Sequence, residues 1–452
     1  MRPTDITIKN VSFSTEDFLY RTPIKFGGIA LDRVTMLNAE IEVETSRGKR
    51  SVGKGSMPLG NVWAFPSKTM AYDKTLGAMK AIAASCASVY AKTKTSGHPI
   101  EITWELEKEL LSNAEAEGRK LNLDDPIPPL ATLVCASPFD AAMHDAYGKA
   151  HQLSCYHTYG GEFLDNDLGR FLGTDFKGVK IEDHVMKEPV ASLPLYHLVG
   201  ALDPLVSQDV VKPVGDGLPE TLGEWVLFNG LTHLKIKLNG DDLSWDVGRV
   251  IGVEKAAEVA QKQRGQSTWH YSLDFNEKCK NVEYLLDFLE QVKEKSPAAF
   301  SRIAYIEQPT GRDLKASRAN VMHAASKQIP VVIDESLLDL ESLLMAREMG
   351  YTGAALKACK GQSQSVVLAS AARHMKMFLC VQDLTCPGAS LIQSASLAAH
   401  VKGVSAIEAN SRQYCPAANT PWEKSFPGIF KITNGSMQTS CLNGLGLGAD
   451  PK

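Results

Sequence analysis

Short apolar runs of strand length alternate with helix-type repeats over the second half of the chain. Eight such runs follow one another, in the order LPLYHLVG, THLKIKL, TWHYSLDF, IAYIEQP, IPVVIDES, GAALKACK, MFLCVQDL and VSAIEAN. Segments between them, such as NVEYLLDFLEQVKEK, carry apolar residues at the spacing of amphipathic helices. Eight strands that alternate with helices predict a (β/α)8 barrel at residues 193–411. The alternative, a doubly wound open sheet, is disfavoured because no Gly-rich dinucleotide turn follows a strand.

The first part of the chain has strands followed by helices. An alternating run from Val34 to Thr45, a turn at Arg47-Gly48 and a return segment predict a β-hairpin. Helix-type repeats follow at 70–93 and 137–153, and the second is expected to begin with Ser137 as its cap and Pro138 next. Residues 160–190 show no clear period, which predicts an irregular segment.

Composition and charge narrow the classes of protein. The 452 residues carry a formal net charge of -4, and no basic block suggests a nucleic acid partner. No apolar run reaches the length of a membrane span, and the first residues lack the apolar core of a signal peptide. Nine cysteines without a Cys-x-x-Cys pair favour neither a disulfide framework nor a zinc site. We therefore expect a cytoplasmic protein with no nucleic acid or membrane partner.

Charged residues recur at the C-terminal ends of the predicted strands, one in each of seven strands. They are Lys237, Asp274, Glu307, Asp334, Lys357, Asp383 and Glu408. Any one acid at a strand end can be explained as a helix cap or as part of a loop ion pair. Among the acids, Glu335 and Glu408 fit that explanation best. The regular set is harder to explain in that way, because these strand ends converge on the mouth where barrel active sites lie.

Two lysines and three acids of this set suggest metal chemistry. Lys235 and Lys237 lie on the same side of one strand, which is costly unless something offsets their charge. Asp274, Glu307 and Asp334 supply hard oxygen ligands, which favour Mg²⁺, with Mn²⁺ next, over zinc. A bound cation and the mutual repulsion of the lysines favour the neutral amine, so a lysine could remove a proton near neutral pH.

The ordered motifs resemble the enolase superfamily, and more closely the muconate lactonizing enzyme-like subgroup of the mandelate racemase/muconate lactonizing enzyme family. They are KIK, Asp274 in LDFNE, Glu307 in IEQP, Asp334 in IDES and Lys357 in ALKACK. TPIKFGG and VETSRGKRSVGKG resemble the family's N-terminal capping domain, and NGLGLG resembles its closing motif. The resemblance implies a TIM-type barrel at 193–411 with an α+β capping domain built from 1–190 and the tail 412–452.

The resemblance also implies an enzyme that removes the proton α to a carboxylate through a Mg²⁺-stabilised enediolate. Carried over by position, the metal ligands would be Asp274, Glu307 and Asp334. The catalytic lysines would be Lys237 on one face, Lys235 beside it and Lys357 on the opposite face. Residues that support the site or contact substrate would be Asn276, Asp383, Glu408, Lys25 and Trp63, the last two within capping segments at 21–28 and 56–66.

Departures from the family pattern restrict the reaction. LCVQDL lacks the histidine of the mandelate racemase type, and KIK argues against enolase itself. IEANSRQ lacks the Asp-x-Asp that dipeptide epimerases use for the substrate's ammonium group, and a single glycine, not a pair, follows Lys357 in CKGQ. We expect an isomerase, a racemase or epimerase of a small α-substituted carboxylate, in a homo-oligomer. The alternatives are a lyase (dehydratase or cycloisomerase), a non-catalytic metal- and ligand-binding barrel, and a Schiff-base aldolase using Lys357.

Overall fold

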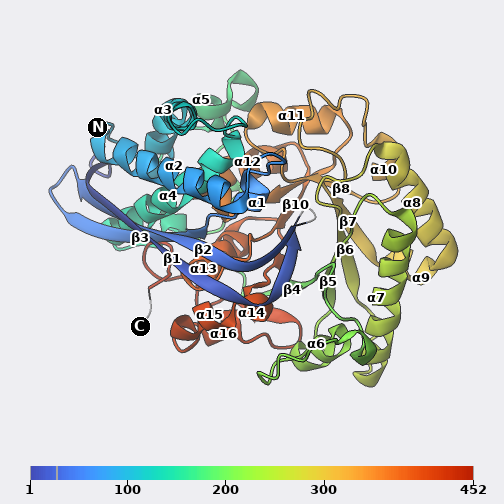
Figure 1. Cartoon of the computed structure of the whole chain (residues 1–452). Helices are drawn as coiled ribbons and strands as arrows, with labels where there is room; N and C mark the ends of the chain where they lie inside the picture. The colour runs from blue at the N-terminus through green and yellow to red at the C-terminus, as the bar shows by residue number, and fades with distance from the viewer. Residues whose placement is uncertain (1, 27–28, 451–452) are drawn as a thin grey trace.

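A computed structural model describes residues 2–26 and 29–450 and shows eight parallel strands closed into a barrel beside a separate antiparallel sheet (Figure 1). The barrel strands are β4 (Ser192–Val199), β5 (His233–Lys237), β6 (His270–Asp274), β7 (Ile303–Glu307), β8 (Val331–Ile333), β9 (Gly353–Leu356), β10 (Phe378–Val381) and β11 (Ile407–Glu408). The last strand, β11, pairs in parallel with β10 and with β4. This closure confirms the predicted barrel and rules out the open sheet.

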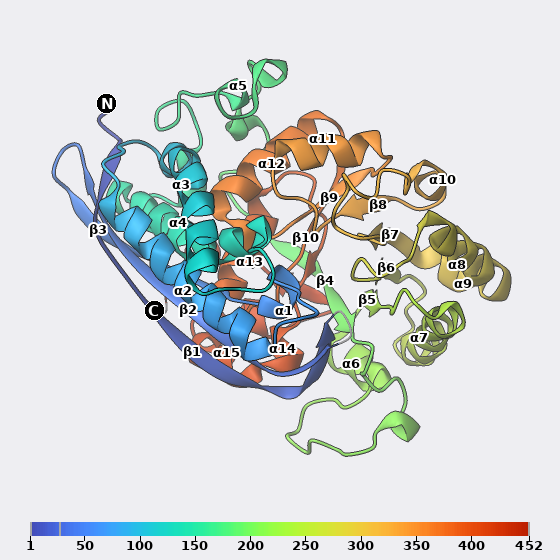
Figure 2. The ribbon, with the colours of Figure 1, turned by 45° about the horizontal axis from the view of Figure 1, so that its top comes forward.

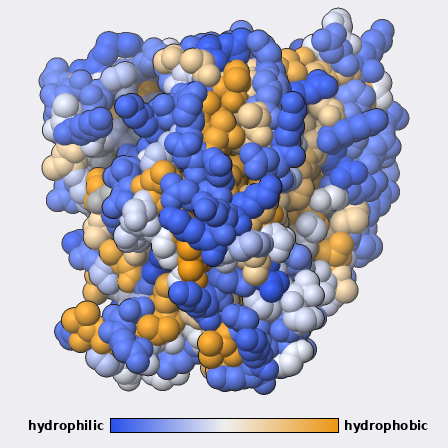
Figure 3. All heavy atoms as spheres, turned by 90° about the vertical axis from the view of Figure 1, so that its right-hand side faces the viewer, coloured by the Kyte–Doolittle hydropathy of each residue, from blue (hydrophilic) through white to orange (hydrophobic). Residues whose placement is uncertain are grey.

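Helices surround the barrel on its outer side (Figure 1). They are α6 (Leu222–Asn229), α7 (Leu243–Gln263), α8 (Val282–Lys295), α9 (Pro297–Arg302), α10 (His323–Ser326), α11 (Leu340–Glu348), α12 (Gln362–His374) and α13 (Ala389–His400). On the flank shown in Figure 3, hydrophilic side chains predominate and hydrophobic ones show in narrower strips between them. The apolar faces of these helices are therefore turned mainly toward the strands, as expected for amphipathic helices.

Strand alternation determines which residues reach the mouth. A buried cluster separate from the main core contains Tyr196, Tyr305, Val332, Ala355, Cys380 and Ala406, from six of the barrel strands and their approaches. Because side chains alternate along a strand, the residue two positions after a member of this cluster points inward again, nearer the C-terminal end. That position holds Glu307, Asp334 or Lys357 on three of the strands.

The capping domain is a three-stranded antiparallel sheet covered by helices. Its elements are β1 (Ile6–Phe26), β2 (Ile29–Thr45), β3 (Arg50–Pro58), α1 (Asn61–Ala64), α2 (Tyr72–Lys92), α3 (Pro99–Lys120) and α4 (Pro129–His151). The pairing of β2 with β3 confirms the predicted hairpin, and α2 lies within the predicted helix at 70–93. Gly27 and Gly28 of the predicted capping segment at 21–28 lie outside the described residues.

The second predicted helix begins earlier than its sequence suggested. Helix α4 starts at Pro129, and Pro138 lies inside it, so the predicted start at Ser137 is wrong. Proline lacks the N–H that would bond to the carbonyl four residues before, which is Val134 O. The hydroxyl of Ser137 donates to that carbonyl instead, at 2.9 Å. The helix therefore continues through a residue that normally ends one.

Helix α4 packs closely on β3 because two strand residues are glycines. A Cβ at Gly55 would lie 1.9 Å from the carbonyl oxygen of Pro138, and one at Gly53 would lie 2.1 Å from that of Ala142. Any side chain at either position would push the helix off the sheet.

The segment between the domains and the C-terminal tail connect the cap to the barrel. Residues 160–190 contain only the short helices α5 (Leu168–Leu172), η2 (Thr174–Phe176) and η3 (Ile181–Asp183), which confirms the irregular segment. The tail forms α14 (Ser411–Tyr414), α15 (Pro416–Glu423), α16 (Pro427–Phe430) and β12 (Ser436–Gln438), which pairs antiparallel with β4. It then returns to the cap, where Gly446 bonds to the backbone of Leu153 and Cys155, so the last part of the described chain lies beside the antiparallel sheet (Figure 2).

No helix within residues 2–26 and 29–450 is both long enough and apolar enough to cross a membrane.

Candidate active site

The ends of β5 and β6 bring the two lysines of the KIK motif against the first acid. Lys237 and Asp274 are register partners on these parallel strands, and Asp274 is in turn the partner of Glu307 on β7. The ammonium group of Lys237 donates to Asp274 Oδ2 and, at 3.2 Å, to Asn276 Oδ1. Asn276 also donates its backbone N–H to Asp274 Oδ1 at 2.7 Å, which fixes the carboxylate's orientation.

Lys235 lies at the centre of three carboxylates. Its Nζ is 3.0 Å from Asp274 Oδ2, 2.7 Å from Glu307 Oε2 and 2.7 Å from Glu408 Oε2. The side chain of Lys235 is only 1% exposed, so these contacts are made away from bulk water. Glu408, a weaker candidate by sequence, is therefore a direct member of the cluster.

A second pair of lysines lies on the opposite side of the mouth. Lys357, which follows β9, places Nζ 2.9 Å from Asp334 Oδ2. Lys360, at the end of the short helix η5 (Ala358–Lys360), places Nζ 3.2 Å from Asp334 Oδ1. The Trp63 ring of the capping domain covers Lys357, whose Nζ is 4.7 Å from the ring centre. Trp63 Nε1 donates to Glu335 Oε1 at 3.1 Å, which ties the cap to the barrel mouth.

A small cavity of about 170 Å³ opens beside Lys237. Its lining includes Lys237 and Asn276 from the mouth and Lys25 from the capping strand β1. Lys25 donates to Asn239 Oδ1 at 3.3 Å. This residue of the capping segment, predicted as a substrate contact, therefore reaches a barrel loop.

Burial and the surrounding charges set the protonation of the acids. Burial alone would raise the pKa of Asp274 and Asp334, but the neighbouring ammonium groups outweigh it and hold both pKa values below the usual range. Burial and the nearby charge of Asp274 raise the pKa of Glu307 well above its usual range. Burial and the adjacent Asp334 likewise raise the pKa of Glu335 to about 7. Asp274 and Asp334 are therefore the acids of the cluster held most firmly as carboxylates, whereas Glu307 and Glu335 take up a proton more readily.

Lys235 and Lys357 are held in the charged form by the acids around them. Burial lowers the pKa of Lys235, but Asp274, Glu307 and Glu408 attract the ammonium group more strongly and raise that pKa well above its usual range. Asp334 and Glu307 do the same for the pKa of Lys357. The neutral amine expected from the sequence rests on a bound cation as well as on repulsion between Lys235 and Lys237, and the carboxylates act in the opposite direction.

Within the described residues, the side chain of Asp383 forms no hydrogen bond or ion pair with the site lysines or acids, although burial and the nearby charge of Glu408 raise its pKa to about 7. Its carboxylate accepts from the backbone N–H groups of Thr385, Cys386 and Asn410, so it closes the turn after β10. The inward residue of this strand is the preceding Gln382, which donates to Glu307 Oε2. Period-two counting from Cys380 could have found Gln382, and Lys360 was missed because η5 was not expected.

The carboxylates of the site suit a divalent cation by their chemistry, although in this structure several of them contact lysines. Within the described ranges, no group of three or more Asp, Glu, His or Cys side chains is arranged to hold a metal ion. Six carboxylates, however, lie in or beside the cluster against four ammonium groups. The acids are Asp274, Glu307, Asp334, Glu335, Asp383 and Glu408, and the bases are Lys235, Lys237, Lys357 and Lys360. The all-oxygen donors of these acids match Mg²⁺ or Mn²⁺.

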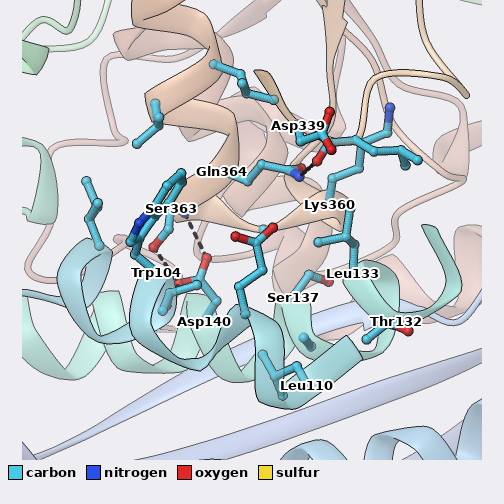
Figure 4. Close-up of a pocket in the computed structure, with 18 of the residues that line it drawn as sticks. Trp104, Leu110, Thr132, Leu133, Ser137, Asp140, Asp339, Lys360, Ser363 and Gln364 are labelled. Atoms are coloured by element: carbon cyan, nitrogen blue, oxygen red, sulfur yellow. Dashed lines mark hydrogen bonds between the residues drawn. The ribbon is translucent and has the colours of Figure 1, made fainter. Parts of the chain in front are cut away.

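A second cavity, of about 90 Å³, lies between the cap and the barrel and is mainly apolar (Figure 4). Asp140 of α4 accepts from Ser363 of α12 there, at 2.8 Å from its N–H and 2.6 Å from its hydroxyl. Lys360 lies on its wall, but the ammonium group of Lys360 is bound to Asp334. This cavity therefore lies at the contact between the two domains and not in the mouth itself.

The chain belongs to the family described as Enolase C-terminal domain-like, whose model matches residues 218–452. This match confirms the resemblance to the enolase superfamily and the mandelate racemase/muconate lactonizing enzyme family. No curated protein sequence matches the chain.

Solved structures of this family share the fold. A mandelate racemase/muconate lactonizing protein from Herpetosiphon aurantiacus is 18% identical, with a TM-score of 0.62 over 100% of both chains. A dipeptide epimerase from Enterococcus faecalis V583, complexed with Mg and the dipeptide L-Leu-L-Tyr, is 15% identical, with a TM-score of 0.62 over 98% of this chain and 99% of that one. A muconate lactonizing enzyme from Pseudomonas fluorescens, complexed with muconolactone, is 14% identical, with a TM-score of 0.59 over 99% of this chain and 97% of that one.

Proposed function

We propose that the protein is a Mg²⁺-dependent enzyme that removes the proton α to a carboxylate, and that it racemises or epimerises a small α-substituted carboxylate. One observation carries the choice of reaction. Lys237 ends β5 and Lys357 follows β9, and three strands separate β5 from β9 in either direction around the closed barrel. Two bases on opposite walls suit removal of a proton from one face and its return to the other.

Three acids would hold the cation. Asp274, Glu307 and Asp334 end or follow the adjacent strands β6, β7 and β8, and their side chains are no more than 1% exposed. Mn²⁺ is the alternative ion. When bound, the cation would supply positive charge beside the substrate carboxylate and offset the acid charge that raises the pKa of Lys235 and Lys357.

The chain's own residues account for the remaining steps. Lys237, oriented by Asp274 and Asn276, would take the α-proton from a substrate in the adjoining cavity. Lys357 would deliver a proton from the other wall, and the Trp63 ring above it would limit access of water. Lys235, held by its three carboxylates, would neutralise charge that develops on the substrate.

A lyase is the second candidate, favoured by an asymmetry between the two lysines. Lys237 lines a cavity, whereas Lys357 lies beneath Trp63 and contacts Asp334. A dehydratase or cycloisomerase needs only one lysine to remove the proton, while the other protonates a leaving group or stabilises charge. The intact acids and lysines disfavour a barrel that binds without turnover. We also propose that the protein acts as a homo-oligomer.

Proton NMR in D₂O tests the proposal. The protein is mixed with Mg²⁺ and a panel of acid sugars, N-acyl amino acids and dipeptides, and loss of the α-proton signal is followed. Exchange of both enantiomers of one compound supports racemisation, whereas exchange accompanied by elimination supports a lyase. Failure of every member to exchange in the presence of Mg²⁺ or Mn²⁺ would count against proton abstraction. Trapping with borohydride tests the Schiff-base alternative at Lys357.

A further inference from the structure

One buried cation among the described residues forms no ion pair with a carboxylate. Arg412, on α14, is 7% exposed and donates from Nη1 to Asn229 Oδ1 at 2.7 Å. Its Nη2 lies 3.3 Å from His197 Nδ1, and its Nε has no hydrogen-bond partner. Both partners are neutral, since burial and the charge of Arg412 itself lower the pKa of His197 well below its usual range. Among the described residues, no acid forms an ion pair with Arg412.

The other buried cations of the described chain differ in this respect. They are Lys235, Lys237, Lys357 and Lys360, and each contacts a carboxylate. The charge of Asp383 acts on Arg412, but the two side chains form no ion pair. A buried charge without a contacting counterion is costly, by several kcal/mol in typical proteins, and an arginine does not shed its proton to avoid that cost. An anion from outside the chain would remove the cost at Arg412.

Arg412 lines a cavity of about 390 Å³ on the flank of the barrel, between α6 and the tail helices α15 and α16. Aromatic side chains form much of its wall, namely Trp225, Phe228 and Phe430. The Arg412 guanidinium carbon lies 5.7 Å from the centre of the Trp225 ring. The lining shares no residue with the cavity beside Lys237.

The charges on the wall select the type of anion. Arg412 and Lys431 are cationic and Glu423 is anionic, so the lining carries one net positive charge. A bound monoanion would bring the net charge of the cavity to zero. A phosphate dianion would leave one negative charge in excess, beside Glu423. The planar guanidinium matches the two oxygens of a carboxylate, and the aromatic wall suits a planar apolar body.

We propose that this cavity, with buried Arg412 among aromatic side chains, is a binding site for an organic monocarboxylate with a planar apolar body. The site is separate from the catalytic mouth and does not depend on the reaction proposed above. The carboxylate would bind the Arg412 guanidinium, and the apolar body would contact Trp225 and Phe228.

Calorimetric titration of the full-length protein with benzoate tests the site. Because the lysine-rich mouth could also bind benzoate, the Lys237→Ala variant is titrated in parallel and should bind with unchanged affinity. Arg412→Gln should weaken binding by about tenfold or more, the amount expected when one charge-assisted hydrogen-bonded pair is lost. Benzamide, which lacks the charge, and inorganic phosphate, which lacks the apolar body, should both bind at least tenfold more weakly than benzoate.

A second pair of variants keeps the test independent of the folding of Arg412→Gln. Phe228 is 60% exposed and its neighbour Leu227 is 44% exposed, so replacing either by alanine should leave the fold intact. Phe228→Ala should weaken benzoate binding severalfold, and Leu227→Ala, which does not line the cavity, should leave it unchanged. The proposal is overturned if benzoate does not bind, if binding disappears in Lys237→Ala, or if benzamide or phosphate binds as tightly.

Discussion

The indole ring of Trp63 covers the ammonium group of Lys357, with 4.7 Å between Nζ and the ring centre. Trp63 belongs to the short cap helix α1, and Lys357 follows strand β9 of the barrel. The cap therefore completes the candidate site as well as covering it, and its position is held by Arg312, which donates to the carbonyl of Trp63 at 3.0 Å.

Replacing Trp63 should reduce the function of Lys357. Trp63→Leu removes both the ring over the ammonium group and the hydrogen bond to Glu335, whereas Trp63→Phe removes only the hydrogen bond. Cation–π contacts of desolvated groups are worth up to about 2 kcal/mol, so we expect the leucine variant to lose roughly tenfold in the rate of α-proton exchange, and the phenylalanine variant less. Trp422→Leu, on α15, is the control. Equal rates for wild type and Trp63→Leu would contradict this role.

The three proposed ligands should be individually necessary for binding Mg²⁺. Asp274→Asn, Glu307→Gln and Asp334→Asn each remove a charged oxygen donor at nearly constant volume. We expect each to abolish measurable Mg²⁺ binding in calorimetry and to stop proton exchange, with the circular dichroism spectrum unchanged. Asp383→Asn is the matched control, since that carboxylate accepts backbone N–H groups at a turn. Undiminished Mg²⁺ affinity in Asp274→Asn would reject the assignment.

The two lysines should act on opposite enantiomers. A lysine exchanges protons only along its own line of approach, so Lys357→Ala should still exchange the α-proton of the enantiomer that faces Lys237 while losing racemisation. Lys237→Ala should show the mirror result, and both can be followed by proton NMR in D₂O. In a lyase, only one lysine would support exchange. Loss of all exchange in both variants, with metal binding retained, would show that Lys357 is not a base.

Acid should weaken the contact between cap and barrel through His144. This histidine of α4 is buried and lies 2.8 Å from the hydroxyl of Ser363 on α12, and burial lowers its pKa to about 4. The unfolded chain takes up this proton near pH 6.5, so the stability contributed by neutral His144 is complete above that pH. It is lost as the pH falls toward 4, at about 1.4 kcal/mol per pH unit.

Urea denaturation at several pH values measures this loss. His144→Asn keeps a hydrogen-bonding group toward Ser363 but does not titrate, so its stability should fall less steeply than that of the wild type between pH 6.5 and 4. Parallel curves for the two proteins would show that His144 does not contribute.

Sequence patterns located the strands of the barrel because alternation and strand length depend on local side chains. Asp274, Glu307, Asp334 and Lys357 could be found in the same way, since each occupies an inward position at a strand end. The start of α4 was missed because a proline normally ends a helix, and only the structure shows the hydroxyl of Ser137 replacing the lost donor. The charge on Lys235 depends on acids from three other strands, and no local pattern contains that information.

The C-terminal tail has a consequence for how the chain folds during synthesis. Strand β12 adds to β4 at the start of the barrel, and Gly446 bonds to Leu153 and Cys155 of the cap. Both partners leave the ribosome long before the tail does. The cap and the first barrel strand must therefore wait, incompletely paired, until residues 436–446 have been synthesised. A nascent chain stalled before residue 436 should remain sensitive to protease in both domains, so neither should be obtainable as an independent fragment.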